Sequence, residues 1–142
     1  MRGIKAECAK SIPYETVGFL VGMYCVWNQE YFTLIDNYIP VRGPASTNHV
    51  IMDTDSVASV LKIIQTKYND NKHIIVGWYH SHPGYGVFLS DADIISQATF
   101  FTQPYHVALV VDPIRQQYDF FKLSVDNRPV KVSYAVWREA HE

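Results

Sequence analysis

The stretch GWYHSHPGYGVFLSDAD, residues 77 to 93, holds the end of a predicted strand and the start of a predicted helix. Ile74 to Tyr79 predicts a buried central strand, because its first three side chains are apolar on both faces. Pro83 has no N–H group and cannot extend a strand ladder. Ser90 suits a helix N-cap, so we predict a helix over Asp91 to Phe101. Functional side chains in this stretch would lie between the end of a strand and the start of a helix.

Strands and helices alternate on both sides of this stretch. The clearest further helix follows Asp53, because apolar residues recur at helical spacing from Val57 to Tyr68. Two runs rich in aromatic and β-branched residues predict a hairpin, Phe19 to Trp27 and Tyr31 to Ile39. The other expected elements are a short helix within residues 3–12, a loop over Val41 to Asn48 with an extended end at His49 to Met52, and strands at Tyr105 to Val111, Gln117 to Leu123 and Val130 to Val136. This order predicts an α/β fold with a mixed, curved sheet flanked by helices, in a single domain of residues 1–142.

Composition narrows the class of partner. The chain has 142 residues, 48% of them hydrophobic, and a formal net charge of −2. Nucleic acid is not an expected partner, because phosphate binding needs clustered Lys and Arg. No membrane association is expected either, since the longest apolar run, Gly18 to Trp27, is about half of a membrane-spanning helix. Cys8 and Cys25 form no disulfide framework. We expect a soluble cytoplasmic protein with free thiols.

Two histidines and an aspartate in the opening stretch predict a metal site. His80 and His82 lie two residues apart on a strand, so their imidazoles project from the same face. Asp93 falls in the first turn of the predicted helix, near the strand end. Two imidazoles and one carboxylate supply three ligands for Zn²⁺ and leave a fourth position for water. Taken singly, these residues also fit plainer roles, as a chance histidine pair and a helix-stabilising charge, with Ser90 acting only as a cap.

A hydrolytic zinc site also needs a base for the attacking water. Glu15, just before the first predicted strand, is the candidate by position, although an acid ahead of an apolar strand is ordinarily a solvated residue. Trp78 has the strand parity of the two histidines and either lines the site or packs in the core. Tyr85, in a Gly-Tyr-Gly turn, either contacts substrate or packs locally.

Several motifs together resemble the JAMM (MPN+) zinc metalloprotease family, most closely the deubiquitinating subunits of the proteasome lid and the signalosome. The motifs are Glu15 followed by GFLVG, then GWYHSHPGYGVFLSDAD, then VALVVDP. The resemblance extends from Pro13 to Leu123 and implies a JAMM/MPN domain, a cytidine-deaminase-like fold with α-β-α layers. It also implies that the chain lacks the family's usual first strand and its C-terminal helices, which predicts a compact, self-contained member.

The resemblance assigns a role to each candidate residue. It implies one catalytic zinc ion held by His80, His82 and Asp93. It implies that Glu15 is the general base and that Ser90 stabilises the oxyanion of the tetrahedral intermediate.

The resemblance also implies how substrate binds. In ubiquitin-directed members the segment that matches Val41 to Asp53 receives the tail of ubiquitin as an added strand. Phe88 stands where those enzymes often carry a tryptophan. The expected substrate contacts are Val50, Ile51, Met52, Tyr85 and Phe88.

The implied function is zinc-dependent hydrolysis of the isopeptide bond between the C-terminal glycine of ubiquitin, or a ubiquitin-like modifier, and a substrate lysine. Expected partners are modifier conjugates and the proteasome. Two alternatives remain open. One is the processing of a small ubiquitin-fold sulfur-carrier protein by the same chemistry. The other is a non-catalytic MPN scaffold, a class that typically lacks one or more metal ligands.

Overall fold

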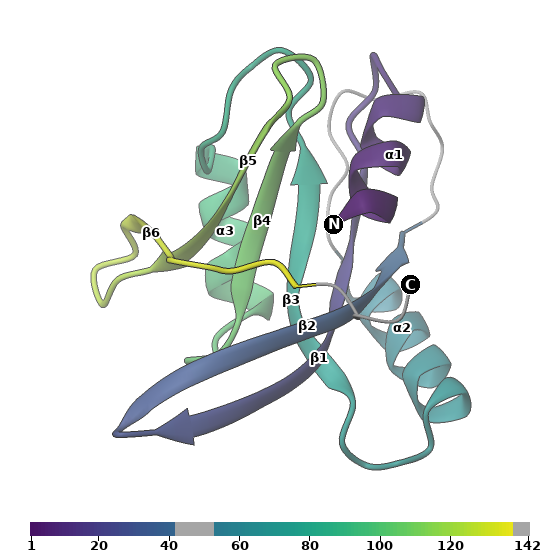
Figure 1. Ribbon diagram of the computed structural model, residues 1–142, viewed down its shortest axis with the longest axis vertical. Helices are drawn as coiled ribbons and strands as arrows, with labels where there is room; N and C mark the ends of the chain where they lie inside the picture. Colours follow the sequence, from purple (N-terminus) through teal and green to yellow (C-terminus); the bar gives the residue numbers. More distant parts are fainter. Residues whose placement is uncertain (42–52, 138–142) are drawn as a thin grey trace.

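The structure is a computed structural model that describes residues 1–41 and 53–137. Within these residues helices and strands alternate in the predicted order (Figure 1). No helix in this part of the chain is long and apolar enough to cross a bilayer. The elements are α1 (Arg2–Lys10), β1 (Val17–Trp27), β2 (Glu30–Pro40), α2 (Thr54–Lys67), β3 (Ile74–Ser81), α3 (Asp91–Phe100), β4 (Val107–Asp112), β5 (Gln117–Leu123) and β6 (Pro129–Lys131).

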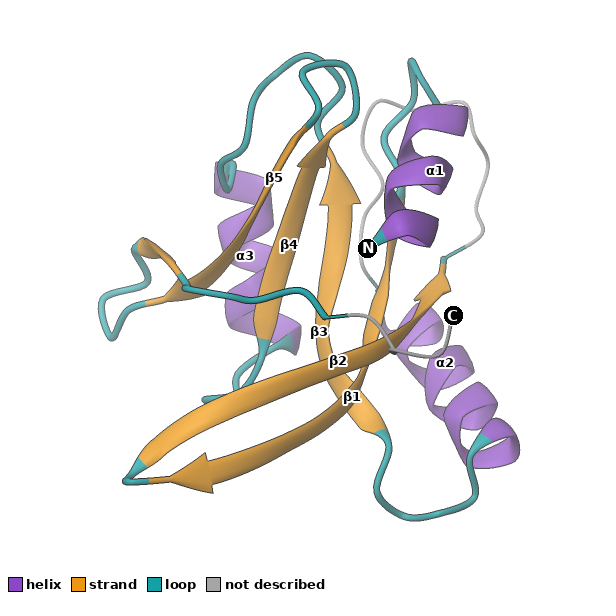
Figure 2. Cartoon of the chain, viewed as in Figure 1, coloured by secondary structure: helices purple, strands orange, loops and turns teal. Residues whose placement is uncertain are grey.

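The six strands form one mixed sheet in the order β2-β1-β3-β4-β5-β6. Strands β3 and β4 run parallel, whereas every other neighbouring pair is antiparallel. A parallel pair needs a crossover connection, which α3 and its flanking loops supply. The long β1–β2 hairpin bends away from β3 and β4 (Figure 2), so the sheet is curved. The predicted mixed, curved sheet flanked by helices is confirmed.

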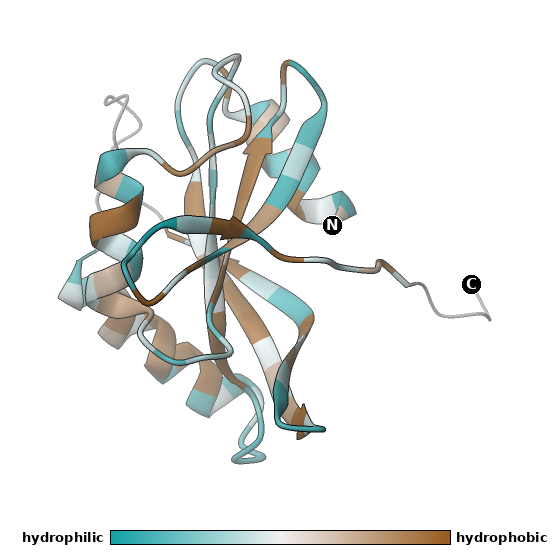
Figure 3. Cartoon of the chain, turned by 90° about the vertical axis from the view of Figure 1, so that its left-hand side faces the viewer, coloured by the Kyte–Doolittle hydropathy of each residue, from teal (hydrophilic) through white to brown (hydrophobic). Residues whose placement is uncertain are grey.

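Helices cover both faces of the sheet. Figure 3 shows apolar residues along the central strands, where two cores meet the sheet from opposite sides. Burial of each aliphatic side chain stabilises the fold by about 1.5–3 kcal/mol. On one face, α2 and α3 cover a core that includes Val60, Ile64, Phe19, Trp78, Val110 and Phe101. On the other face, α1 covers a core that includes Ile4, Cys8, Leu20, Tyr79, Leu109 and Phe120. The three layers match the expected α-β-α arrangement.

A β-bulge in β3 decides which side chains face α2 and α3. The β1–β3 register skips Val76, which is the extra residue of the bulge. Val76 packs in the α1 core, yet Trp78, two residues later, packs in the core under α2 and α3. Gly77, between them, has no room for a side chain, because a Cβ atom there would overlap the carbonyl oxygen of Val107. The bulge therefore turns Trp78 and the histidines after it toward α3.

The last predicted strand is shorter than expected. Of the alternating segment Val130 to Val136, only the part up to Lys131 pairs with β5. The Val132 N–H still donates to the Phe120 carbonyl at 2.9 Å, and the chain then runs across the face of the sheet (Figure 1). There the Tyr134 ring packs 4.9 Å from the Phe120 ring. Contact with the sheet face, rather than strand pairing, accounts for the alternation, so the prediction of a strand to Val136 is wrong.

Candidate metal and active site

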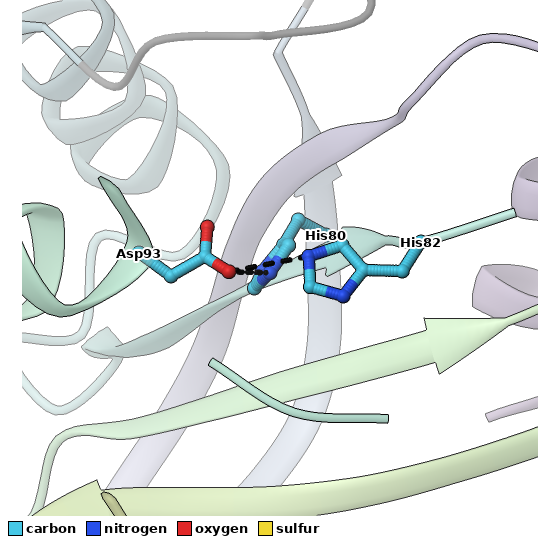
Figure 4. A group of neighbouring side chains, drawn as sticks. All are labelled: His80, His82 and Asp93. Atoms are coloured by element: carbon cyan, nitrogen blue, oxygen red, sulfur yellow. Dashed lines mark hydrogen bonds and ion pairs between the residues drawn. The ribbon is translucent and has the colours of Figure 1, made fainter. Parts of the chain in front are cut away.

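β3 and α3 bring the three predicted metal ligands together (Figure 4). The Nε2 atoms of His80 and His82 lie 2.9 and 3.2 Å from Oδ2 of Asp93. One ligand atom from each residue lies within 4.8 Å of the others, and the described residues contain no second group of this kind. The side chains of the histidines are 6% exposed and that of Asp93 is 14% exposed. This composition and burial make the group a candidate metal centre.

Neighbouring strands hold the histidine backbone on both sides. His80 pairs with Val17 of β1 and with Val110 of β4. The His82 N–H, just past the strand end, donates to the Val111 carbonyl at 2.8 Å. Both imidazoles therefore project from backbone that is fixed in the middle of the sheet.

Ser90 and Asp93 form a reciprocal capping box at the start of α3. Ser90 Oγ accepts the Asp93 N–H at 3.2 Å, and Asp93 Oδ2 accepts the Ser90 N–H at 2.8 Å. The oxygen that faces the histidines is thus also held by the helix start, where the helix dipole favours negative charge. The helix predicted from Ser90 is confirmed. Its cap uses a lone pair of the Ser90 hydroxyl and not its proton.

The electrostatics of the group favour a neutral His80 imidazole beside an ionised Asp93 carboxylate. Burial lowers the pKa of His80 and keeps the ring neutral near pH 7. Burial alone would raise the pKa of Asp93, but hydrogen bonds from His80 and His82, together with the Ser90 N–H, hold that pKa well below its usual range. Neutral imidazole and ionised carboxylate are the forms that bind a divalent metal ion.

Ring packing surrounds the two imidazoles. The His80 ring is stacked on Trp78, with centroids 4.5 Å apart and planes at 14°. The His82 ring meets His80 edge-on at 4.6 Å and lies 4.8 Å from the Phe88 ring. The Nδ1 atoms of both histidines are buried, and neither has a hydrogen-bond partner within residues 1–41 and 53–137. From the sequence, Trp78 was expected either to line the site or to pack in the core. It does both, because it packs in the core and its ring is stacked on that of His80.

The backbone pairing of Thr16, which follows Glu15, indicates where Glu15 lies relative to this group. Thr16 and Ser81 exchange two hydrogen bonds: the Ser81 N–H donates to the Thr16 carbonyl at 2.9 Å, and the Thr16 N–H donates to Ser81 Oγ at 2.8 Å. Directly opposed residues of antiparallel strands have their side chains on the same face. From the Thr16–Ser81 pairing we infer that Glu15, which is half-buried, lies across from His82. Glu15 is not itself part of the group of ligand atoms.

The loop between His82 and α3 carries two of the predicted substrate contacts. Tyr85 is 64% exposed, so local packing does not bury it. Phe88 is 45% exposed, and its ring packs against that of His82. The other predicted contacts, Val50, Ile51 and Met52, lie outside the described residues.

Asp112, at the end of β4, shapes this loop, and sequence reasoning missed it. Its carboxylate is fully buried and accepts the N–H groups of Gly84 and Gly86 at 2.9 and 2.8 Å. Two further N–H donors, from Ile114 and Arg115, lie 3.0 Å away. Gly84 and Gly86 have φ angles of 79° and 91°, which favour glycine. The available signal was an Asp-Pro after a buried strand, combined with two glycines after the histidines.

Gln97, on α3, is the second residue that sequence reasoning missed. It is 2% exposed, and its Oε1 accepts the indole N–H of Trp78. The available signal was its spacing, because a polar residue four positions after Asp93 lies on the same face of the helix.

A cavity of about 670 Å³ lies on the opposite face of the sheet, away from these residues. It is walled by β2, β4, β5 and the segment after β6, and its lining is mostly apolar, with Lys122 as the charged residue. It contains none of the candidate residues. The candidate site is therefore identified from the chemistry of its side chains and not from the size of a cavity.

Two comparisons with known sequences identify relatives. Residues 4–103 match the family model described as JAB1/Mov34/MPN/PAD-1 ubiquitin protease. The chain is 34% identical over 107 residues to the 26S proteasome non-ATPase regulatory subunit 14 of Dictyostelium discoideum. It is 36% identical over 106 residues to COP9 signalosome complex subunit 5 of Eremothecium gossypii. These matches cover 73% and 72% of this chain but only 33% and 24% of the relatives, so the chain spans a third or less of their length.

A comparison with solved structures gives the same fold. The crystal structure of a JAB1/MPN domain protein from Archaeoglobus fulgidus superposes with a TM-score of 0.57 at 14% identity, covering 93% of this chain and 88% of that one. The resemblance carried by the histidine, serine and aspartate motif is thereby confirmed at the level of the family. This chain belongs to the JAB1/Mov34/MPN/PAD-1 ubiquitin protease family.

Proposed function

We propose that this chain is a zinc-dependent isopeptidase, which cleaves the bond between the C-terminal glycine of ubiquitin, or a ubiquitin-like modifier, and a substrate lysine. The observation that carries the proposal is the buried group of His80, His82 and Asp93 at a helix start, with Glu15 two residues before the neighbouring strand β1. Family membership supports the reaction class. The names of two relatives, subunits of the proteasome and the signalosome, support ubiquitin conjugates and the proteasome as partners.

His80, His82 and Asp93 fit one zinc ion. Two imidazole nitrogens and one carboxylate oxygen are a common catalytic set, and they leave a position open for water. Neither cysteine competes, since Cys8 is a residue of α1 that is buried against the sheet, and Cys25 is exposed on the hairpin. When bound, zinc supplies a Lewis acid that lowers the pKa of a water molecule and polarises the scissile carbonyl.

The remaining roles belong to side chains around the ligands. The Glu15 carboxylate accepts a proton from the attacking water and delivers it to the nitrogen of the leaving lysine. The Ser90 hydroxyl donates a hydrogen bond to the carbonyl oxygen as negative charge develops there. Its proton is available for this because the helix cap uses only a lone pair. Tyr85 and Phe88 contact the tail of the modifier.

Cleavage of a lysine-linked ubiquitin dimer tests the proposal. We expect about one zinc ion per chain, and cleavage that a chelator abolishes and added zinc restores. Glu15→Gln is expected to lower kcat by about 10²–10⁴-fold while zinc stays bound. Glu30→Gln, which alters an exposed carboxylate at the start of β2, is the control and is expected to leave kcat unchanged.

Each other outcome of this test has a definite meaning. Cleavage that survives metal removal, or that survives in Glu15→Gln, contradicts the mechanism. Cleavage of a sulfur-carrier fusion but not of the ubiquitin dimer keeps the chemistry and changes the substrate. A purified chain that binds no zinc contradicts the proposal and supports the scaffold alternative.

A further inference from the structure

We infer that Trp78 and Gln97 position His80 for metal binding, through ring stacking and not through a hydrogen bond to the imidazole. The inference rests on the proposed zinc site. Trp78 and Gln97 do not belong to the group of ligand atoms, so they act through His80 and are positioning residues.

His80 lacks the contact that usually orients a metal-binding histidine. In most sites the ring nitrogen that does not bind the metal donates its N–H to a carboxylate, a carbonyl or water, and this bond fixes the ring plane. In His80 that nitrogen is Nδ1, since Nε2 faces Asp93, and Nδ1 is buried without a partner in the described part of the chain. The Trp78 ring, nearly parallel at 14°, is the flat surface against which the imidazole lies. Rotation of the imidazole about its Cβ–Cγ bond would break this stack.

Trp78 is in turn fixed by α3. Its indole N–H donates to Gln97 Oε1, and its ring is stacked on Phe101 with centroids 5.7 Å apart. Gln97 is the fully buried residue of α3. A buried polar side chain is costly without a partner, so its presence under the helix is explained by this hydrogen bond.

The two contacts join α3 to β3 one helical turn apart. Asp93 reaches the histidines with the oxygen that serves as a ligand atom, and an ion bound there would take over that contact. Gln97 reaches Trp78 without using any ligand atom, so this contact keeps its hydrogen bond whether or not an ion is bound. The helix that carries Asp93 is therefore tied to the strand that carries His80 by a contact independent of the metal.

Zinc affinity, measured by competition with a chromophoric chelator on the full chain, tests this inference without any substrate. Gln97→Leu leaves the Trp78 N–H unpaired and is expected to weaken zinc binding by about 10–100-fold, the usual effect of losing an outer contact of a metal site. Adding Trp78→Phe to Gln97→Leu removes both polar partners and keeps an aromatic face. The double variant is expected to bind zinc within about threefold of the original chain. This difference is much smaller than the loss of affinity expected from Gln97→Leu alone.

A second pair of variants keeps the test decisive if Gln97→Leu fails to fold. The double variants Gln97→Leu/Trp78→Phe and Gln97→Leu/Trp78→Leu differ only in the ring beneath His80, and the leucine form is expected to bind about 10–100-fold more weakly. Phe121→Leu alters the same core without a ring contact to Trp78 or His80, and its zinc affinity is expected to stay unchanged.

The outcomes separate this inference from the proposed function. If the original chain binds zinc and the two double variants bind it equally, the positioning role is wrong while the zinc site stands. If the original chain binds no zinc, the proposed function fails, and the positioning role fails with it.

Discussion

Replacing Ser90 by alanine separates the two roles that this residue has in the proposed site. As a cap, Ser90 Oγ accepts a single hydrogen bond from the Asp93 N–H at 3.2 Å. Loss of an N-cap side chain costs about 0.5–2 kcal/mol, and the length of this bond points to the lower half of that range. The reciprocal bond from the Ser90 N–H to Asp93 is made by backbone and survives the substitution. We therefore expect a fall in Tm of roughly 3 °C.

The effect on catalysis is expected to be much larger than the effect on stability. Removal of one oxyanion donor lowers kcat by about 10²–10³-fold, which corresponds to about 2.7–4 kcal/mol in the transition state. If Ser90 acts only as a cap, its loss should change kcat only slightly, through a small shift in the position of Asp93. The two roles thus predict kcat values for Ser90→Ala that differ by at least two orders of magnitude, while they predict the same Tm.

Ser124→Ala is the matched control, because it makes the same chemical change at a distant turn. In the turn between β5 and β6, Ser124 Oγ accepts the Arg128 N–H at 3.1 Å and its hydroxyl also donates to Asp126 Oδ1, so this variant loses at least as many hydrogen bonds as Ser90→Ala. The measurements are Tm, bound zinc and kcat on a ubiquitin dimer for both variants. Both should retain zinc and lose a little stability, and only Ser90→Ala should lose kcat. If Ser90→Ala keeps its kcat within about fivefold, a factor far below that of a lost oxyanion donor, its role is capping alone.

Three further predictions concern the scaffold. Hydrogen bonding to Asp70 raises the pKa of His73, so the stability it adds is full below about pH 6.5 and is lost as the pH rises through the folded-state value. In urea titrations the original chain should exceed His73→Gln in stability at pH 5.5 and lose that advantage by pH 8.5; an advantage that grows with pH would refute this. Gly77→Ala forces a Cβ atom against a backbone carbonyl of β4 and should lower the free energy of unfolding by about 1–3 kcal/mol or more; a loss below about 0.5 kcal/mol by urea titration would mean that β3 and β4 can separate at little cost. Burial raises the pKa of Cys8 to about 12, so iodoacetamide at pH 8 should add one adduct by mass, on the exposed Cys25, and two adducts on folded protein would contradict the burial.

The local features of the site could be predicted from sequence. His80 and His82 share a face because a strand has a period of two, and Ser90 begins a helix because its side chain caps the Asp93 N–H. These relations involve residues a few positions apart, so propensity and spacing are sufficient to predict them.

The relations that depend on distant pairing could not be predicted in this way. The inferred position of Glu15 across from His82 depends on the pairing of Thr16 with Ser81, two residues that are 65 positions apart in sequence. The bulge at Val76 is set by how two strands fit together, and it decides which face Trp78 occupies. Spacing within one segment carries no information about either.

The same limit applies to side chains that join two elements. Asp112 binds backbone groups of two separate loops, and its sequence context shows only the end of a strand. Gln97 looks like a surface residue of a helix until its indole partner on β3 is known. The strand expected to reach Val136 failed for a related reason, because alternation shows that one side of a chain is apolar but not whether a neighbouring strand is there to pair with it.

The loop held by Asp112 has a consequence for how substrate preference can change over evolution or by design. Every hydrogen bond that Asp112 receives from this loop comes from a backbone N–H, of Gly84 or Gly86, and none comes from the side chain of Tyr85 between them. The loop is therefore expected to keep its shape with any side chain at position 85 except proline, which lacks the N–H that donates to the His82 carbonyl at 3.1 Å, provided that the glycines on either side remain. Selection, or a saturation library at this one codon, can vary the exposed side chain next to the proposed cleavage site without rebuilding the scaffold.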